Sequence, residues 1–145
     1  MKTTTVLLAL LLLATAASAQ PTRYFSDYRS HQRANIDVIA TRMLACLESP
    51  NEGVVESALA HIGLMKLYLP DQRFSDLESK IRFLAIDGAN QAIRYRAYLV
   101  SSIFRDPAAF TADTSQNYND PDEFFGAIGE RLQQSTLGLN QLVQK

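Results

Sequence analysis

The chain has 145 residues, with 14 basic and 15 acidic side chains, two histidines, one cysteine and a formal net charge of −1. Its length fits one domain of about 100–150 residues, and its hydrophobic content of 47% disfavours a disordered chain. One cysteine excludes an intramolecular disulfide and any metal site built from several cysteines, while the near-neutral charge argues against a generic nucleic-acid binder.

Residues 1–19 have the pattern of a secretory signal peptide. Lys2 precedes an apolar run over residues 6–14, and small residues follow up to Ala19. A basic start, an apolar core of about 7–15 residues and an A-x-A site define such signals, whereas a bilayer-spanning helix needs about 20 apolar residues. We therefore expect cleavage after Ala19 and export to the periplasm or the medium. The mature chain, residues 20–145, would have no membrane span.

The single cysteine, Cys46, would then face an oxidising compartment, where cysteines normally pair. It follows Ile36, Ile39 and Met43 at the spacing of one helix face. We interpret it as a small buried hydrophobic residue. An intermolecular disulfide and a reactive thiol are the alternatives.

Three capping patterns, beginning at Ser49, Ser75 and Asp120, predict helix starts. Each has an oxygen-bearing side chain, and a Glu follows three residues later. Both side chains satisfy backbone N–H groups that a helix start leaves unpaired, and the acidic charge suits the helix dipole.

The apolar spacing between these starts is helical, and no segment alternates over strand length, so we predict an all-α fold. Pro70 and Gly88 end two of the helices. Three glycines weaken the last helix, and we expect a break near Gly138. The five expected helices cover residues 27–47, 51–69, 76–86, 90–104 and 121–144.

The connection over residues 106–119 is polar and rich in turn-forming residues, so we expect a solvated linker. Its alternating Asp, Ser and Asn side chains are reminiscent of a calcium loop. However, Tyr118 occupies the glycine position of an EF-hand and Phe124 the position of its last ligand. We predict no metal site.

A shift of 39 residues aligns the chain with itself, since Leu47 then matches Ile86 and Asn51 matches Asn90. Two helices per period of about 40 residues are typical of an α-solenoid. The second helix of each unit, with its Asn followed by apolar residues and Ala, resembles HEAT-type repeats. Further matched pairs are Leu44/Phe83, Glu48/Asp87, Ala58/Ala97 and Leu64/Ile103.

The resemblance covers residues 33–105 and implies two HEAT-like helix pairs within a single domain, residues 20–145. A loop over residues 106–119 and a C-terminal capping helix over residues 120–145 would complete that domain. An ordinary five-helix bundle is the alternative architecture.

The sequence contains no catalytic motif, phosphate-binding loop or metal-binding pair of histidines. His31 and His61 fall in different expected helices, and neither forms a recognisable motif with Cys46. We therefore predict a protein that is not an enzyme, with no catalytic, cofactor-binding or metal-ligating residues and no cofactor.

The charge is unevenly placed, with a net +3 over residues 66–105 and −4 over residues 106–145. If Ile93 and Ala97 point inward, Arg94, Tyr95 and Tyr98 reach the rim of their helix or solvent. Arg and Tyr are enriched at protein interfaces, so these three residues form our candidate interaction face. The alternative is that both tyrosines pack against neighbouring helices and that Arg94 and Arg96 pair with local acidic residues.

Together these features predict a small exported HEAT-like protein that binds or scaffolds another envelope or secreted protein and not nucleic acid. The alternative class is a helical-bundle enzyme or small-ligand carrier of the cell envelope, which needs a deep pocket lined by polar groups. A homo-oligomer is a further alternative.

Overall fold

The computed structural model describes residues 24–25 and 33–143, which form an all-helical structure without strands, as predicted. The expected signal peptide, residues 1–19, lies outside the described residues. The elements are α2 (Arg33–Cys46), α3 (Glu52–Tyr68), α4 (Ser75–Asp87), α5 (Gln91–Arg105), the 3₁₀ helix η3 (Pro107–Ser115) and α6 (Pro121–Val143).

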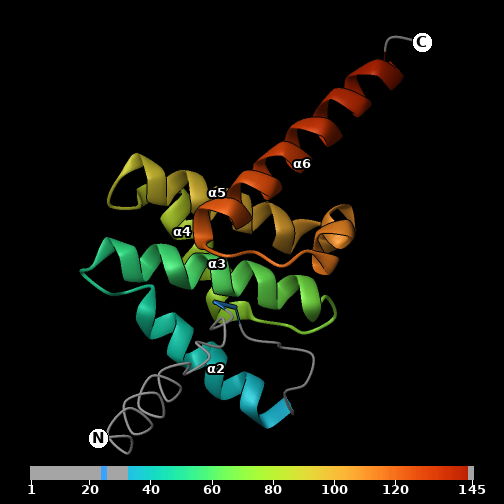
Figure 1. The fold of residues 1–145 in the computed structure, drawn as a ribbon. Helices are drawn as coiled ribbons and strands as arrows, with labels where there is room; N and C mark the ends of the chain where they lie inside the picture. Colours follow the sequence, from blue (N-terminus) through green and yellow to red (C-terminus); the bar gives the residue numbers. More distant parts are fainter. Residues whose placement is uncertain (1–23, 26–32, 144–145) are drawn as a thin grey trace, which may run out of the picture.

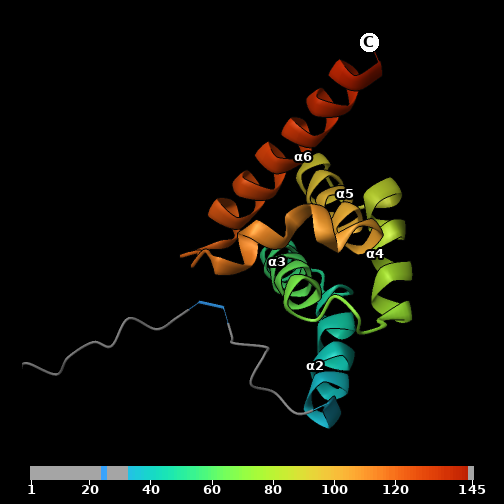
Figure 2. The ribbon, with the colours of Figure 1, turned by 90° about the vertical axis from the view of Figure 1, so that its right-hand side faces the viewer.

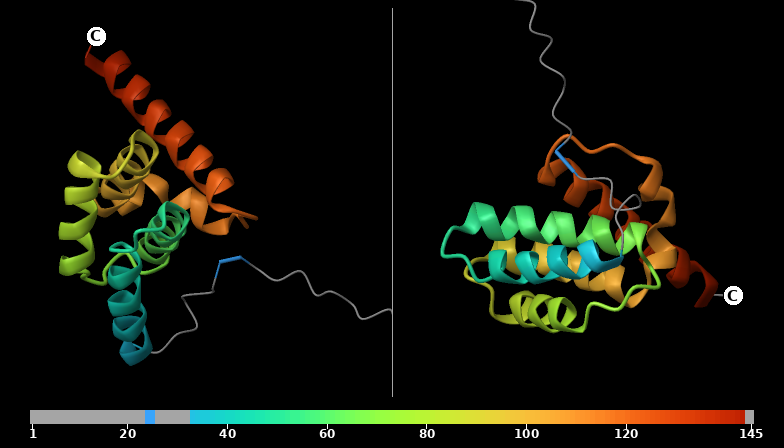
Figure 3. Two further views of the ribbon diagram at one scale, coloured as in Figure 1. Left: turned by 90° about the vertical axis from the view of Figure 1, so that its left-hand side faces the viewer. Right: turned by 90° about the horizontal axis from the view of Figure 1, so that it is seen from below.

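Helix α3 is the centre of the fold, because it contacts α2, α5, η3 and α6 (Figure 1). Helix α4 packs along α5 and also contacts α2. The chain thus forms two consecutive helix pairs, α2–α3 and α4–α5, whose second helices lie side by side (Figure 3).

Helix α6 packs on the body only with its first turns and then runs past it (Figures 1 and 2). Phe124, Phe125 and Ile128 are buried, Leu132 is half-buried, and residues 133–135 are exposed. Within the described residues, no helix combines the length and apolarity needed to cross a bilayer.

Periodic apolar residues hold the helix pairs together. On α5, Ile93, Ala97 and Val100 are fully buried at the predicted spacing of three and four residues. Burial of the larger two, Ile93 and Val100, stabilises the fold by roughly 1.5–3 kcal/mol each. The core side of α4 is formed in the same way by Leu77, Ile81 and Leu84.

The helix bounds agree with the prediction to within about one residue for α3, α4 and α5. The first expected helix covered residues 27–47, and α2 covers Arg33–Cys46 of it, while residues 27–32 lie outside the described residues. The expected break near Gly138 is wrong, because α6 continues to Val143. One glycine costs a helix only about 1 kcal/mol, which does not interrupt it.

Two of the three predicted caps are also wrong. Asn51 is the N-cap of α3 and accepts from the backbone N–H of Gly53, whereas Ser49 accepts from that of Asn51. The cap therefore lies two residues later than predicted, because Asn51 has the extended backbone and the amide oxygen that a cap requires. Ser75 is already the first residue of α4, after Phe74, and makes no capping hydrogen bond.

The third cap is confirmed. Asp120 accepts from the backbone N–H of Glu123 at 2.8 Å. The Glu123 carboxylate in turn accepts from the backbone N–H of Asn119, one residue before the usual capping box. Asp120 thereby directs the chain into α6.

The connection at residues 106–119 is not a solvated linker. Most of it forms η3, and Phe110 and Tyr118 are buried. Both aromatic residues belong to the core, and η3 contacts α3, α5 and α6. Because most residues of this connection are polar, the sequence did not indicate that Phe110 and Tyr118 pack into the core. Their packing holds the start of α6 against the other helices.

The 39-residue echo is kept at the second helices, where Asn51 and Asn90 are both N-caps. The first helices differ, because Val38 of α2 is exposed and its match in α4, Leu77, is buried. Hence α2 and α4 present different faces to the core.

Candidate interaction face on helix α5

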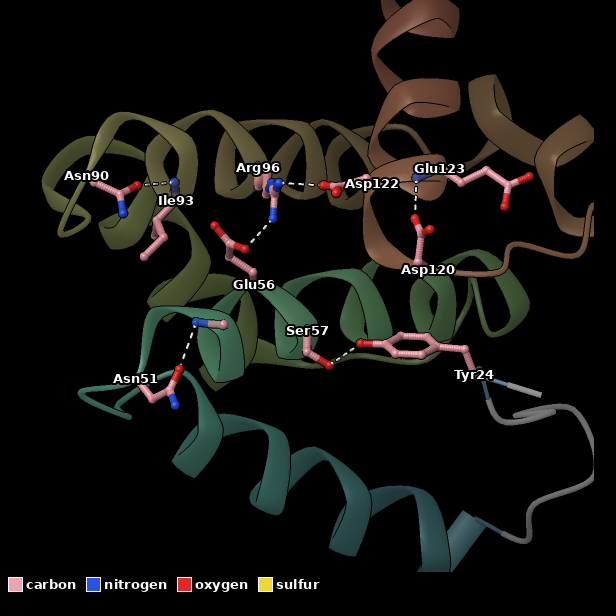
Figure 4. Close-up of polar contacts among 11 residues, drawn as sticks. Tyr24, Asn51, Glu56, Ser57, Asn90, Ile93, Arg96, Asp120, Asp122 and Glu123 are labelled. Atoms are coloured by element: carbon pink, nitrogen blue, oxygen red, sulfur yellow. Dashed lines mark hydrogen bonds and ion pairs between the residues drawn. The ribbon is translucent and has the colours of Figure 1, made fainter. Parts of the chain in front are cut away.

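The local sequence fixes the start and rotation of α5. The Asn90 side chain accepts from the backbone N–H of Ile93 at 2.8 Å, which caps the helix (Figure 4). Gly88 precedes this cap, and a Cβ there would lie 2.6 Å from the carbonyl oxygen of Leu84 and 2.9 Å from Ile93. Only glycine allows so close a turn between α4 and α5.

Ile93 and Ala97 point from α5 into the hydrophobic core. The three predicted residues, Arg94, Tyr95 and Tyr98, lie on the sides of α5 that face away from this core. Tyr95 and Tyr98 are 52% and 45% exposed. Single exposed apolar residues are normal, but two exposed tyrosines three residues apart on one side of a helix together offer contact area of the kind enriched at protein interfaces.

Arg94 is half-buried and turns toward the α4–α5 connection. Its guanidinium donates to the carbonyl oxygen of Gly88 at 2.9 Å. This hydrogen bond uses one of the five guanidinium N–H groups. Arg94 therefore supports the turn as well as lying at the edge of the face.

Tyr95 lies at the opposite edge, beside α6. A Cβ at Gly129 would lie 3.1 Å from the Tyr95 hydroxyl, so the glycine lets this ring approach α6. Beside the ring is an open groove of about 350 Å³ between α5 and α6. The groove is lined by Ala92, Tyr95, Arg96, Phe125, Gly126, Gly129, Glu130 and Gln133.

Arg96 is the residue that sequence reasoning missed. It lies 2.6 Å from the Glu56 carboxylate of α3 and 2.7 Å from that of Asp122 on α6 (Figure 4). Its guanidinium also lies over the ring of Phe125, 5.3 Å from the ring centre. Because both ion-pair partners are distant in sequence, no local pattern marks this residue, which joins three helices beneath the groove.

A second hollow of about 400 Å³ lies between α2 and α3 and is lined by Cys46, Ser57 and His61, among others. Cys46 is a free, half-buried thiol, which corrects the expectation of a buried one. Helix α3 contacts α2 less extensively than it contacts α5. His31 lies outside the described side chains.

His61 stands in an aromatic cluster. Its ring stacks on Tyr24 with centres 5.4 Å apart, and Phe25 lies 4.9 Å away. The Tyr24 hydroxyl and Ser57 share a 2.6 Å hydrogen bond (Figure 4). Burial lowers the pKa of His61, because the low-dielectric surroundings disfavour the charged imidazolium.

Among the described residues, no three His, Cys, Asp or Glu side chains gather closely enough to hold a metal ion. Comparison with protein families, curated proteins and solved structures finds no match.

Proposed function

We propose that this chain is an exported, non-catalytic helical module that binds another envelope or secreted protein through the outward side of α5. The observation that carries the proposal is the exposure of Tyr95 and Tyr98 on one rigid helix, next to an open groove. Aromatic residues held on a rigid support supply contact area at a small entropic cost.

The support beneath this surface favours binding over mere exposure. Arg96 ties α5 to α3 and α6, and the Asn90 cap and Gly88 turn hold its beginning. A preformed surface loses little conformational entropy when a partner docks. The Asn-capped second helices also support the proposed relation to HEAT-like repeats.

The export part of the proposal rests on the signal-peptide pattern of residues 1–19 and is tested separately. Expression in the source cell followed by sequencing of the protein's N-terminus should find Gln20 first. A mature protein that still begins at Met1 would contradict export by this signal.

Binding is tested by capture from an envelope fraction with the purified chain as bait. The Tyr95→Ala/Tyr98→Ala variant should lose at least one partner that the unmodified chain retains, while Val38→Ala, an exposed apolar change on α2, should retain it. The lost partner, once purified, should bind the double variant about tenfold or more weakly. Equal binding to both variants would remove this face from the proposal.

The hollow beside Cys46 and His61 is the place where a small-ligand carrier would hold its cargo. It favours this alternative only because the thiol of Cys46 on α2 and the hydroxyl and imidazole of Ser57 and His61 on α3 line the same hollow. A carrier would show ligand-dependent thermal stabilisation that Ser57→Val/His61→Leu abolishes and Tyr98→Ala leaves intact. If the chain is a binding module, Tyr98→Ala should instead weaken binding of the protein partner, and Ser57→Val/His61→Leu should leave that binding intact.

A further inference from the structure

Helix α4 exposes two large apolar side chains one turn apart. Phe83 is 52% exposed and Ile86 is 82% exposed. The helix already buries Leu77, Ile81 and Leu84 against the core, so these two residues are not needed for its packing there. Helix α4 lies at an edge of the molecule in both side views (Figures 2 and 3).

Charged residues flank this apolar pair in a definite order. At spacings of three and four residues, Lys80 precedes Phe83 by one turn and Asp87 follows it by one turn, so all lie along one side of the helix. The Lys80 ammonium lies 5.7 Å from the centre of the Phe83 ring and 3.4 Å from the carboxylate of Glu48. Asp87 is exposed and makes no ion pair with any residue that the structure describes.

We infer that this side of α4 docks onto α4 of a second copy of the chain, with the two helices antiparallel across a two-fold axis near Phe83. This arrangement places the apolar pairs together and sets Lys80 of each copy beside Asp87 of the other. A parallel arrangement would bring like charges together. A surface that is complementary to itself in this way is what an isologous dimer requires.

The dimer surface differs from the Arg94, Tyr95 and Tyr98 face, and the inference does not depend on the proposed function. One helix of 13 residues forms a contact below the size of a standard stable interface. Association is therefore weak and concentration-dependent. Exposed ion pairs make it weaker in high salt.

Sedimentation equilibrium of the purified chain over a wide concentration range tests the inference. We expect a monomer–dimer equilibrium that Ile86→Asp abolishes and that the matched change Tyr98→Asp on α5 preserves. Circular dichroism should show both variants to be as helical as the unmodified chain, because both positions are exposed. A monomer at every concentration, or a dimer lost only with Tyr98→Asp, would overturn the inference.

A charge exchange tests the antiparallel pairing itself. Asp87→Lys and Lys80→Glu should each weaken self-association about tenfold, because each places like charges opposite one another. When the two variants are mixed, each Lys faces a carboxylate again, and a heterodimer should form. Mixed variants that remain monomeric at concentrations where the unmodified chain dimerises would overturn this geometry.

Discussion

Individual residues matter here mainly where they connect helices that are distant in sequence. Arg96 is the clearest case, since one guanidinium serves Glu56 on α3 and Asp122 on α6 while it covers Phe125. The side chains of Arg96 and Glu56 are only 19% and 27% exposed, so solvent screens this ion pair less than an ordinary surface pair, whereas Asp122 is 81% exposed and contributes less. Lys66 acts more locally and donates to the carbonyl oxygens of Pro70 and Gln72 in the α3–α4 connection.

Replacing Arg96 should therefore destabilise the protein more than replacing a surface arginine. We expect Arg96→Ala to lower the free energy of unfolding by about 1.5–3 kcal/mol, the range for hydrogen bonds to charged groups. Arg82→Ala is the matched control, because Arg82 pairs with Glu78 at 3.1 Å in an exposed position within one helix. Its cost should be roughly 0.5 kcal/mol or less. Urea unfolding measures both, and equal losses would contradict the bridging role of Arg96.

His61 should make stability depend on pH. Its pKa is lowered in the folded state, so the unfolded chain binds the proton more readily, and acid favours unfolding. Stability due to neutral His61 is fully present above its unfolded pKa of about 6.5 and is lost as the pH falls through the folded pKa. Urea unfolding at pH 7 and pH 5 should thus give a smaller loss for His61→Gln than for the unmodified chain. Identical losses would show that burial of His61 has no energetic weight.

At the scale of the helices, the caps and close approaches determine where each element starts and how near it lies to its neighbour. Asn51, Asn90 and Asp120 each accept a backbone hydrogen bond at a helix start. Gly63 on α3 lies directly against Phe124 of α6, whereas Gly126 on α6 has open space around it. Glycine is therefore needed for the close approach of α3 and α6 at position 63, whereas at position 126 a larger side chain would have room.

The caps can be compared directly. Asp120→Ala and Asn90→Ala should each lower the unfolding free energy by about 1 kcal/mol, because each leaves a backbone N–H at a helix start without its partner. Ser75→Ala should change it by only a few tenths, since Ser75 makes no capping hydrogen bond. Thermal unfolding followed by circular dichroism provides the ranking. A Ser75→Ala loss as large as the others would restore Ser75 as a cap.

Replacing two of the glycines by alanine should change the stability of the protein in opposite directions. A Cβ at Gly63 would lie 2.9 Å from the Phe124 ring in a closed core, and overpacking of about 1–3 kcal/mol should outweigh the roughly 0.5–1 kcal/mol that Ala gains in a helix interior, so Gly63→Ala should be destabilising overall. Gly126→Ala meets nothing within 4 Å and should stabilise α6 by roughly 0.5–1 kcal/mol. Denaturant midpoints that move in the same direction for both would contradict this packing.

For the whole molecule, local sequence signals predicted the helical class and most helix bounds, because apolar periodicity, Pro70 and Gly88 act within a few residues. They did not predict the core roles of Phe110 and Tyr118, since a polar loop with two aromatic residues looks solvated until its neighbours are in place. Ser49 and Asn51 are both residue types that cap helices well, and only the backbone conformation shows that Asn51 is the N-cap of α3.

The candidate face could likewise be predicted only in part, where its geometry follows from the local sequence. Inward-pointing Ile93 and Ala97 were enough to place Tyr95 and Tyr98 outside, since one helix determines that geometry. The groove beside Tyr95 and the Arg96 bridge depend on α6, which packs against α5 only in three dimensions. Long-range contacts of this kind leave no signature in a single sequence.

Site-specific photo-crosslinking in the source cell tests the proposed binding face most directly. A photoreactive phenylalanine analogue at position 95 or 98 should give an adduct with one and the same partner protein. The analogue at position 38, an exposed site on α2, should give none with that partner. Absence of adducts at positions 95 and 98, or the same adduct from position 38, would contradict binding through α5.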